Sequence, residues 1–166
     1  VSDATFFQLD LAVAGSYLYF TRTQPELGTE LWRTDGTPEN ATLVVDLEPG
    51  PDSNRIRRLV PVGENLVIVE EDRLWVSDGT PAGTIEVFEG RFDGAVEWNG
   101  KVYFLGVSAL GLREGGLYET DGSALGTRRA DFLPPISFSE SPLVATPSGL
   151  YFLAFDTTIG AMALWK

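Results

Sequence analysis

The 166-residue chain carries 24 acidic and 12 basic residues, and its net charge of −12 opposes binding to the phosphate backbone of nucleic acids. It contains neither cysteine nor histidine, which excludes disulfides, thiolate nucleophiles, zinc–thiolate sites and catalytic relays that need an imidazole. It also lacks an apolar run of eighteen residues, so no membrane-spanning helix is expected. We expect one globular domain over residues 1–166 that needs no cofactor.

A short motif, a leucine followed by tryptophan or tyrosine, recurs along the chain. Its aromatic residue falls at Trp32, Trp75, Tyr118 and Trp165, at intervals of 43, 43 and 47 residues. Nearly equal steps of this size indicate an internal repeat. The approximate repeats are 1–46, 47–88, 89–132 and 133–166, and the last lacks its final strand.

Each repeat contains strand-like segments in a fixed order. In the first repeat, apolar and polar residues alternate over 7–13, the period of a half-buried strand. Four segment types are predicted: a first at 7–13, 56–62, 95–98 and 142–146; a second at 17–20, 66–69, 102–104 and 150–152; a third around each aromatic residue of the motif; and a fourth at 42–46, 84–88 and 127–132.

No helical pattern competes with these strands, because 18 glycines and 10 prolines interrupt the chain too often for an amphipathic helix. A four-stranded antiparallel unit repeating every 40–50 residues is typical of a β-propeller blade. The sequence therefore predicts an all-β fold, a β-propeller of about four four-stranded blades. We expect these blades to form part of a larger or incompletely closed ring.

An Asp-Gly-Thr or Asp-Gly-Ser triplet follows the first three copies of the motif. Aspartate in a turn accepts a hydrogen bond from a backbone N–H two residues on, and glycine tolerates positive φ. A ring of aspartates that binds cations or sugars is the alternative. We predict a structural turn role for Asp35, Gly36, Thr37, Asp78, Gly79, Thr80, Asp121 and Gly122.

The four repeated aromatic residues are predicted to be core residues. A large ring buries enough apolar area to hold neighbouring blades together. The alternative is a shelf of exposed rings that stacks against sugars. On the packing interpretation, Trp32, Trp75, Tyr118 and Trp165 lie between blades.

Two charged clusters have functional alternatives. The acidic linker 46–54 offers the oxygen ligands that calcium prefers, but its spacing matches no calcium-loop pattern, so a solvated loop is predicted. Arginines at 55, 57, 58, 128 and 129 are expected to be outward-facing charges on strands. Their alternative is a sialidase-like pocket in which arginines grip a carboxylate beside a tyrosine nucleophile.

The repeat resembles a bacterial family of propeller-like repeats with the motif Glu-Leu-Trp-x-Ser/Thr-Asp-Gly-Thr. The first copy matches almost continuously through Glu30, Leu31 and Trp32 and the triplet at 35–37. The second copy keeps the turn, and the third substitutes Tyr118 and Ser123. The resemblance implies a secreted or cell-surface bacterial protein with a binding or scaffolding role, and it implies no catalytic residue.

The sequence thus favours a non-catalytic binding or scaffolding module that engages a protein or saccharide partner through the hairpins 21–28, 70–73, 108–116 and 156–161. One alternative is a glycoside-cleaving enzyme that uses two carboxylates. Another is a calcium-dependent adhesion module. Because the chain starts at Val1 and stops within a repeat, we expect a fragment of a longer propeller or a chain completed by other copies. Candidate acids for the enzyme are Glu70, Glu71, Asp72, Glu97 and Asp156.

Overall fold

The computed structural model of the chain describes residues 10–51, 56–109, 115–130, 136–137, 143–156 and 158–166. Within these residues the regular structure consists of β-strands and one short 3-10 helix, and the strand pairings are antiparallel. The prediction of an all-β chain with antiparallel sheets is confirmed. No helix in the described part of the chain is long and apolar enough to cross a membrane.

The first sheet, called unit 1, contains four strands in chain order, β1-β2-β3-β4. Tight turns join neighbouring strands, as expected where two consecutive strands pair. The connection between its last two strands carries the 3-10 helix. The elements are β1 (Leu11–Ala14), β2 (Tyr17–Gln24), β3 (Gly28–Thr34), η1 (Pro38–Asn40) and β4 (Thr42–Val45).

The second sheet has seven strands in the order β11-β10-β9-β8-β7-β6-β5 and contains two repeats. Unit 2 comprises β5, β6, β7 and residues 85–89 of β8, and unit 3 comprises residues 90–98 of β8 with β9, β10 and β11. The elements are β5 (Arg58–Val62), β6 (Asn65–Val69), β7 (Arg73–Ser77), β8 (Ile85–Trp98), β9 (Lys101–Ser108), β10 (Gly116–Thr120) and β11 (Arg128–Arg129).

The 14-residue strand β8 corrects the expectation of two separate strands at 84–88 and 95–98. Its first part pairs with β7 and its second part with β9, with a shift of register between Asp93 and Ala95. Residues 85–98 contain no proline, whereas the connection from unit 1 to unit 2 contains Pro49 and Pro51. Proline lacks the N–H that a central strand must donate, so the connection from unit 1 to unit 2 leaves the sheet, whereas residues 85–98 can continue in it.

The last sheet, called unit 4, is built around one long strand. β12 and β13 pair with the two ends of the same edge of β14, and β15 pairs with the other edge. Within the described residues, no strand pairs with the outer edge of β15. The elements are β12 (Ile136–Ser137), β13 (Val144–Thr146), β14 (Gly149–Asp156) and β15 (Ala161–Trp165).

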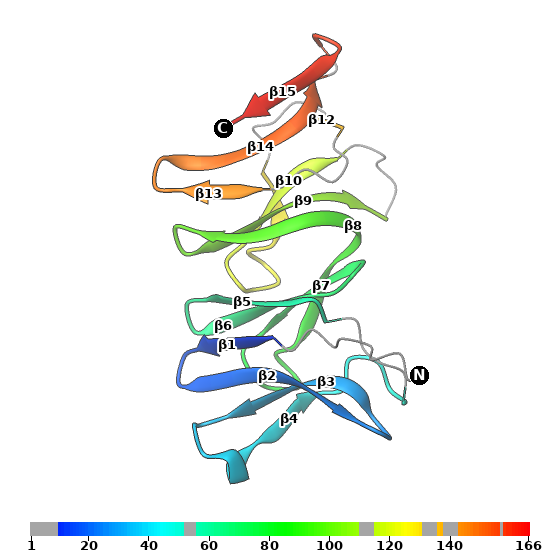
Figure 1. The fold of residues 1–166 in the computed structure, drawn as a ribbon, viewed down its shortest axis with the longest axis vertical. Coiled ribbons are helices and arrows are strands. Elements are labelled where there is room, and N and C mark those ends of the chain that lie inside the picture. The colour runs from blue at the N-terminus through cyan, green and yellow to red at the C-terminus, as the bar shows by residue number, and fades with distance from the viewer. Residues whose placement is uncertain (1–9, 52–55, 110–114, 131–135, 138–142, 157) are drawn as a thin grey trace, which may run out of the picture.

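The four units are stacked in chain order along the long axis of the molecule, with units 1 and 4 at opposite ends (Figure 1). The first strands of successive units are neighbours, and hydrogen bonds link them at each step. The Leu59 N–H donates to Asp10 Oδ2 at 2.5 Å, and Arg58 Nη1 donates to the Ala95 carbonyl at 2.7 Å. Trp98 Nε1 donates to the Thr146 carbonyl at 2.9 Å.

The core formed by the described residues is divided into three clusters, one between each pair of successive units. One leucine of the repeat joins each cluster: Leu31 the first, Leu74 the second and Leu117 the third. All three leucines are buried. The stability of the stack therefore depends on contacts between neighbouring units.

Candidate functional site

The aspartates of the repeated triplet make local hydrogen bonds at three separate turns. Asp78 Oδ1 accepts the Thr80 N–H at 2.8 Å and the Thr80 hydroxyl at 2.7 Å. Asp35 and Asp121 accept the N–H of Thr37 and Ser123 in the same way, both at 3.0 Å. Each aspartate is thus engaged in its own turn.

Three of the four repeated aromatic residues lie at the interfaces between described units, whereas Trp32 does not. Trp75 packs against the first core cluster, Tyr118 against the second and Trp165 against the third. Trp32, in unit 1, has no preceding unit among the described residues, and the Arg22 guanidinium lies 4.8 Å from the centre of its ring. The rings are half-buried.

The described arginines of the two predicted clusters contact different partners. Arg55 lies outside the described residues. Arg57 forms an ion pair with Glu71 at 3.1 Å, and Arg128 forms one with Glu119 at 2.9 Å. Arg58 and Arg129 donate to backbone carbonyls.

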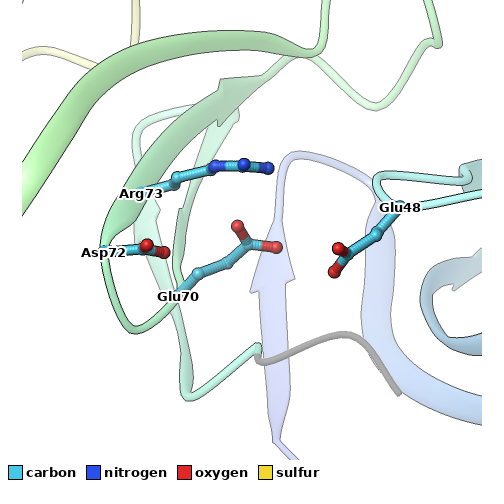
Figure 2. Close-up of a pocket in the computed structure, with 4 residues that line it drawn as sticks. All are labelled: Glu48, Glu70, Asp72 and Arg73. Atoms are coloured by element: carbon cyan, nitrogen blue, oxygen red, sulfur yellow. The ribbon is translucent and has the colours of Figure 1, made fainter. Parts of the chain in front are cut away.

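Acidic side chains from two connections meet in a polar pocket of about 150 Å³. Glu48 follows β4, and Glu70, Asp72 and Arg73 belong to the β6–β7 hairpin. The hairpin is closed by a hydrogen bond from the Glu70 N–H to the Arg73 carbonyl at 3.0 Å. Figure 2 shows the carboxyl groups of Glu48 and Glu70 pointing toward one another across the pocket.

Among the described residues that line the pocket, three are acids and one is an arginine, and Arg73 also lies 3.9 Å from Glu86. Glu70 is held in place by its Oε2 atom, which accepts the Trp75 indole N–H at 3.1 Å. The repeated tryptophan of unit 2 therefore orients one of the acids.

A fourth acid, Glu30, is fully buried in β3, with 0% of its surface exposed. Its Oε2 accepts the Leu47 N–H at 2.9 Å, and its Oε1 has no hydrogen-bond partner. Burial raises the pKa of Glu30 from 4.5 to about 7, against the lowering effect of the Leu47 hydrogen bond. The nearby charges of Asp46, Glu70 and Glu48 raise this pKa further.

Part of this acidic pocket could be anticipated from the sequence. Glu70 and Asp72 were candidate acids and Glu48 belongs to the acidic linker, but nothing in their spacing paired them. Glu97 and Asp156, two other candidates, lie near the ends of β8 and β14 and accept backbone N–H groups from the turns that follow. Glu30 was not singled out, although it is the glutamate of the repeat motif, at the position that Arg73 occupies in the next repeat.

No group of three or more acids in the described residues has the geometry of a metal site. For the acidic linker, residues 52–54 lie outside that part of the chain. The described residues of the linker therefore do not form a calcium site.

A second, apolar pocket of about 450 Å³ lies between units 3 and 4. At the corresponding place in the first two interfaces, the turn after the third strand packs against the preceding unit. Gly79 lies against Tyr19, and Gly122 lies against Val62. In the first two interfaces a turn of the repeat itself therefore occupies the place where the apolar pocket lies. This place belongs to the packing between units, so the acidic pocket is the better candidate for a ligand site. The apolar pocket is lined by Trp98, Tyr103, Leu117, Ser148, Gly149, Leu150, Phe152 and Lys166.

No family model and no curated protein matches the chain. Among solved structures, it is similar to puromycin hydrolase with a TM-score of 0.45 and 16% identity, over 93% of this chain and 29% of that one. It is also similar to a chain of a nidogen/laminin complex, with a TM-score of 0.39 and 13% identity, over 95% of this chain and 78% of that one. With TM-scores below 0.5, these likenesses assign neither a family nor a function. The chain spans less than a third of the length of the hydrolase.

Proposed function

We propose that this chain is a non-catalytic binding module that captures a cationic side chain of a protein partner in the acidic pocket. The observation that carries the proposal is the facing pair of carboxylates, Glu48 and Glu70, in a pocket whose described lining also includes Asp72 and Arg73. A guanidinium or ammonium group can donate hydrogen bonds to both carboxylates at once.

We further propose that the units are blades of a β-propeller in a secreted or cell-surface bacterial protein. The neighbouring first strands and the repeated aromatic residues between units support the propeller, since blades pack face to face around an axis. The cellular location is an expectation from the repeat resemblance.

The chemistry of the pocket favours a cationic protein partner over a saccharide. Sugar sites commonly offer an aromatic face, whereas the described residues lining this pocket are all charged. The net charge of −12 also attracts a basic partner over distance, an effect that salt weakens.

A glycoside-cleaving activity has less support. With a pKa of about 7, Glu30 resembles a general acid, which must hold its proton near neutral pH. A general acid must also reach the substrate, and Glu30 is fully buried. The observed environment of Glu30 therefore favours an electrostatic role beneath the pocket.

The test uses a short peptide with blocked ends and a central arginine, and a matched peptide with citrulline in its place. Isothermal titration calorimetry at low salt should detect saturable binding of the arginine peptide only, because citrulline has the same shape without the charge. The double variant Glu48→Gln/Glu70→Gln keeps the side-chain sizes and should weaken binding by about tenfold or more.

Glu39→Gln is the matched control, because Glu39 is an exposed acid outside the pocket. It removes one negative charge and should leave the affinity within about twofold of the parent chain. Equal binding of the citrulline peptide, or unchanged affinity in the double variant, would refute the proposal.

A further inference from the structure

A pocket of about 250 Å³ lies between units 1 and 2, beside the turn that follows β7. Unit 1 lines it with the β1–β2 turn and the first residues of β2, and unit 2 lines it with Glu64, Asn65 and Asp78. Asn65 begins β6, whereas Glu70 of the acidic pocket follows the other end of that strand. The two pockets are therefore separate sites at opposite ends of β6.

Tyr19 brings a buried hydroxyl group to this pocket. The residue is 1% exposed and belongs to the pocket lining. Its hydroxyl lies against the turn of unit 2, where a methyl group at Gly79 would collide with it. No described residue forms a hydrogen bond with this hydroxyl. Because buried polar groups are almost always paired, the hydroxyl indicates that a molecule in the pocket supplies the partner.

Tyr17 adds an aromatic ring that the repeat does not require. The same place in units 2, 3 and 4 is held by Asn65, Lys101 and Gly149. Tyr17 is 37% exposed, and the Arg33 guanidinium lies 4.2 Å from the centre of its ring. This contact fixes the ring at the pocket while part of it stays open to a ligand.

The remaining polar groups of the pocket include both donors and acceptors. The Tyr19 hydroxyl and the Asn65 amide can donate, and the carboxylates of Glu64 and Asp78 accept. Asp78 uses its Oδ1 atom within its own turn, which leaves Glu64 and the second oxygen of Asp78 as acceptors. A sugar hydroxyl donates and accepts, whereas an ammonium or guanidinium group only donates. The two carboxylates also disfavour an anion, so the chemistry fits a neutral, hydroxylated ligand.

We propose that this pocket, called the Tyr17 pocket, binds one ring of a neutral saccharide. The apolar face of the sugar ring packs against Tyr17, and the sugar hydroxyls form hydrogen bonds with Tyr19 and Glu64. The volume of the pocket is below the range of about 300–1,000 Å³ that encloses drug-sized ligands, so it suits a single ring. This site goes beyond the proposed capture of a cationic group and does not depend on it, because the two pockets use different residues.

The experiment titrates the ¹⁵N-labelled 166-residue chain with the methyl glycosides of glucose, galactose, mannose and N-acetylglucosamine, followed by NMR chemical shifts. At least one glycoside should bind saturably, with a Kd of about 1–10 mM for a single ring in a small pocket. The amide signals of residues 15–19 and 64–65 should shift together. The methyl glycoside of glucuronic acid should bind about threefold or more weakly than that of glucose, because its carboxylate meets two others.

Tyr19→Phe removes only the hydroxyl and should weaken binding about threefold or more. It should fold like the parent chain by circular dichroism, because no described residue pairs with that hydroxyl. Tyr151→Phe is the matched control: Tyr151 holds the same place in unit 4, where its hydroxyl lies 3.2 Å from Ser148 Oγ, outside the Tyr17 pocket. This control should leave the affinity within about twofold of the parent chain.

The aromatic contact is tested at the exposed ring. Tyr17→Ala should weaken binding about fivefold or more, and Tyr17→Phe, which keeps the ring, should stay within about twofold. The double variant Glu48→Gln/Glu70→Gln should bind the glycosides like the parent chain, because its changes lie in the acidic pocket.

Four results would overturn the proposal. They are the absence of saturable shifts with all four neutral glycosides, an unchanged affinity in Tyr19→Phe, an unchanged affinity in Tyr17→Ala, and a glucuronide that binds as tightly as the glucoside. Saturable shifts at residues 15–19 with the arginine peptide and none with the glycosides would instead identify a second cationic site. Such a result would refute the saccharide assignment while leaving the acidic pocket to its own test.

Discussion

The first and second interfaces of the stack use the same repeat for different chemistry. Between units 2 and 3 the core is aromatic: Phe88 and Phe104 meet edge to face at 5.1 Å, and Phe104 stacks on Tyr118 at 5.3 Å. Where units 1 and 2 adjoin, the repeated tryptophan instead donates a hydrogen bond to Glu70, and Glu30 lies buried nearby.

The two interfaces therefore contribute differently to the stability of the chain and to the candidate site. An aromatic cluster stabilises the fold through buried area and ring geometry. A buried carboxyl group with an unsatisfied oxygen costs stability, and such groups are concentrated at functional sites. The second interface therefore acts as the scaffold, and the first interface supports the candidate site.

The largest expected effect comes from breaking the aromatic interface. Phe104 is fully buried and contacts three other rings, so Phe104→Ala should destabilise the chain by about 3–5 kcal/mol. Urea denaturation followed by tryptophan fluorescence measures the change. Leu125→Ala, at an exposed position, should alter stability by less than about 0.5 kcal/mol. Similar losses for both variants would contradict the role given to the second interface.

The next effect tests the buried acid at the first interface. Because the pKa of Glu30 is raised to about 7, the folded chain keeps a proton that the unfolded chain releases above about pH 4.5. Stability should therefore fall as the pH rises from about 4.5 to above 7. The shift corresponds to on the order of 3 kcal/mol.

Glu30→Gln cannot ionise and should lose this pH dependence. Relative to the parent chain it should gain on the order of 3 kcal/mol between about pH 5 and about pH 8, measured by urea denaturation at each pH. Glu39→Gln, at an exposed acid, should follow the parent chain at both pH values. A parent chain whose stability does not fall over this range would show that Glu30 is ionised without penalty.

A smaller effect distinguishes a turn packed at the first interface from an unpacked one. Gly79 and Gly36 both have positive φ, at 84° and 105°. A methyl group at Gly79 would collide with the Tyr19 hydroxyl, whereas one at Gly36 would meet no atom within 4 Å. Gly36→Ala should cost about 1–2 kcal/mol from backbone strain alone. Gly79→Ala should cost about 1–3 kcal/mol more, by thermal or urea denaturation. Equal costs would mean that the turn does not pack as described.

The smallest effect concerns a feature that the two interfaces share. Asp78→Ala and Asp121→Ala each remove the acceptor of an exposed turn and should each cost about 1 kcal/mol. Hydrogen bonds from the Thr80 and Ser123 side chains lower the pKa values of these aspartates. Their contribution should therefore be present at neutral pH and be lost as the pH falls through the ordinary range of aspartate. A large difference between the two variants would show that one aspartate does more than hold its turn.

The repeat motif predicted much of the strand order, because alternation and turn residues act locally. It did not predict that β8 would run through two repeats, since that depends on whether a sheet can continue across a connection. The first strand of unit 4 was predicted at 142–146, but the described structure has β13 at 144–146 and a separate β12 at 136–137. Of the predicted strand at 127–132, β11 covers 128–129, residues 127 and 130 lie outside it, and residues 131–132 lie outside the described residues.

The candidate site was less accessible to sequence reasoning. Glu48 and Glu70 are far apart in the chain and belong to different connections, and only the stacking of units 1 and 2 brings their carboxyl groups face to face. The pKa of Glu30 depends on burial, and the motif gave no sign of it.

The sequence by itself determined the all-β character of this protein, because alternating side chains, glycines and prolines act over a few residues. Tertiary structure decided which equivalent positions are covered. Leu74 and Leu164 hold the same place in the repeat, yet one is buried and the other exposed, because burial depends on the neighbouring unit and not on the local sequence. Tertiary structure also gathered the acids into one pocket, because electrostatic interaction depends on distance in space.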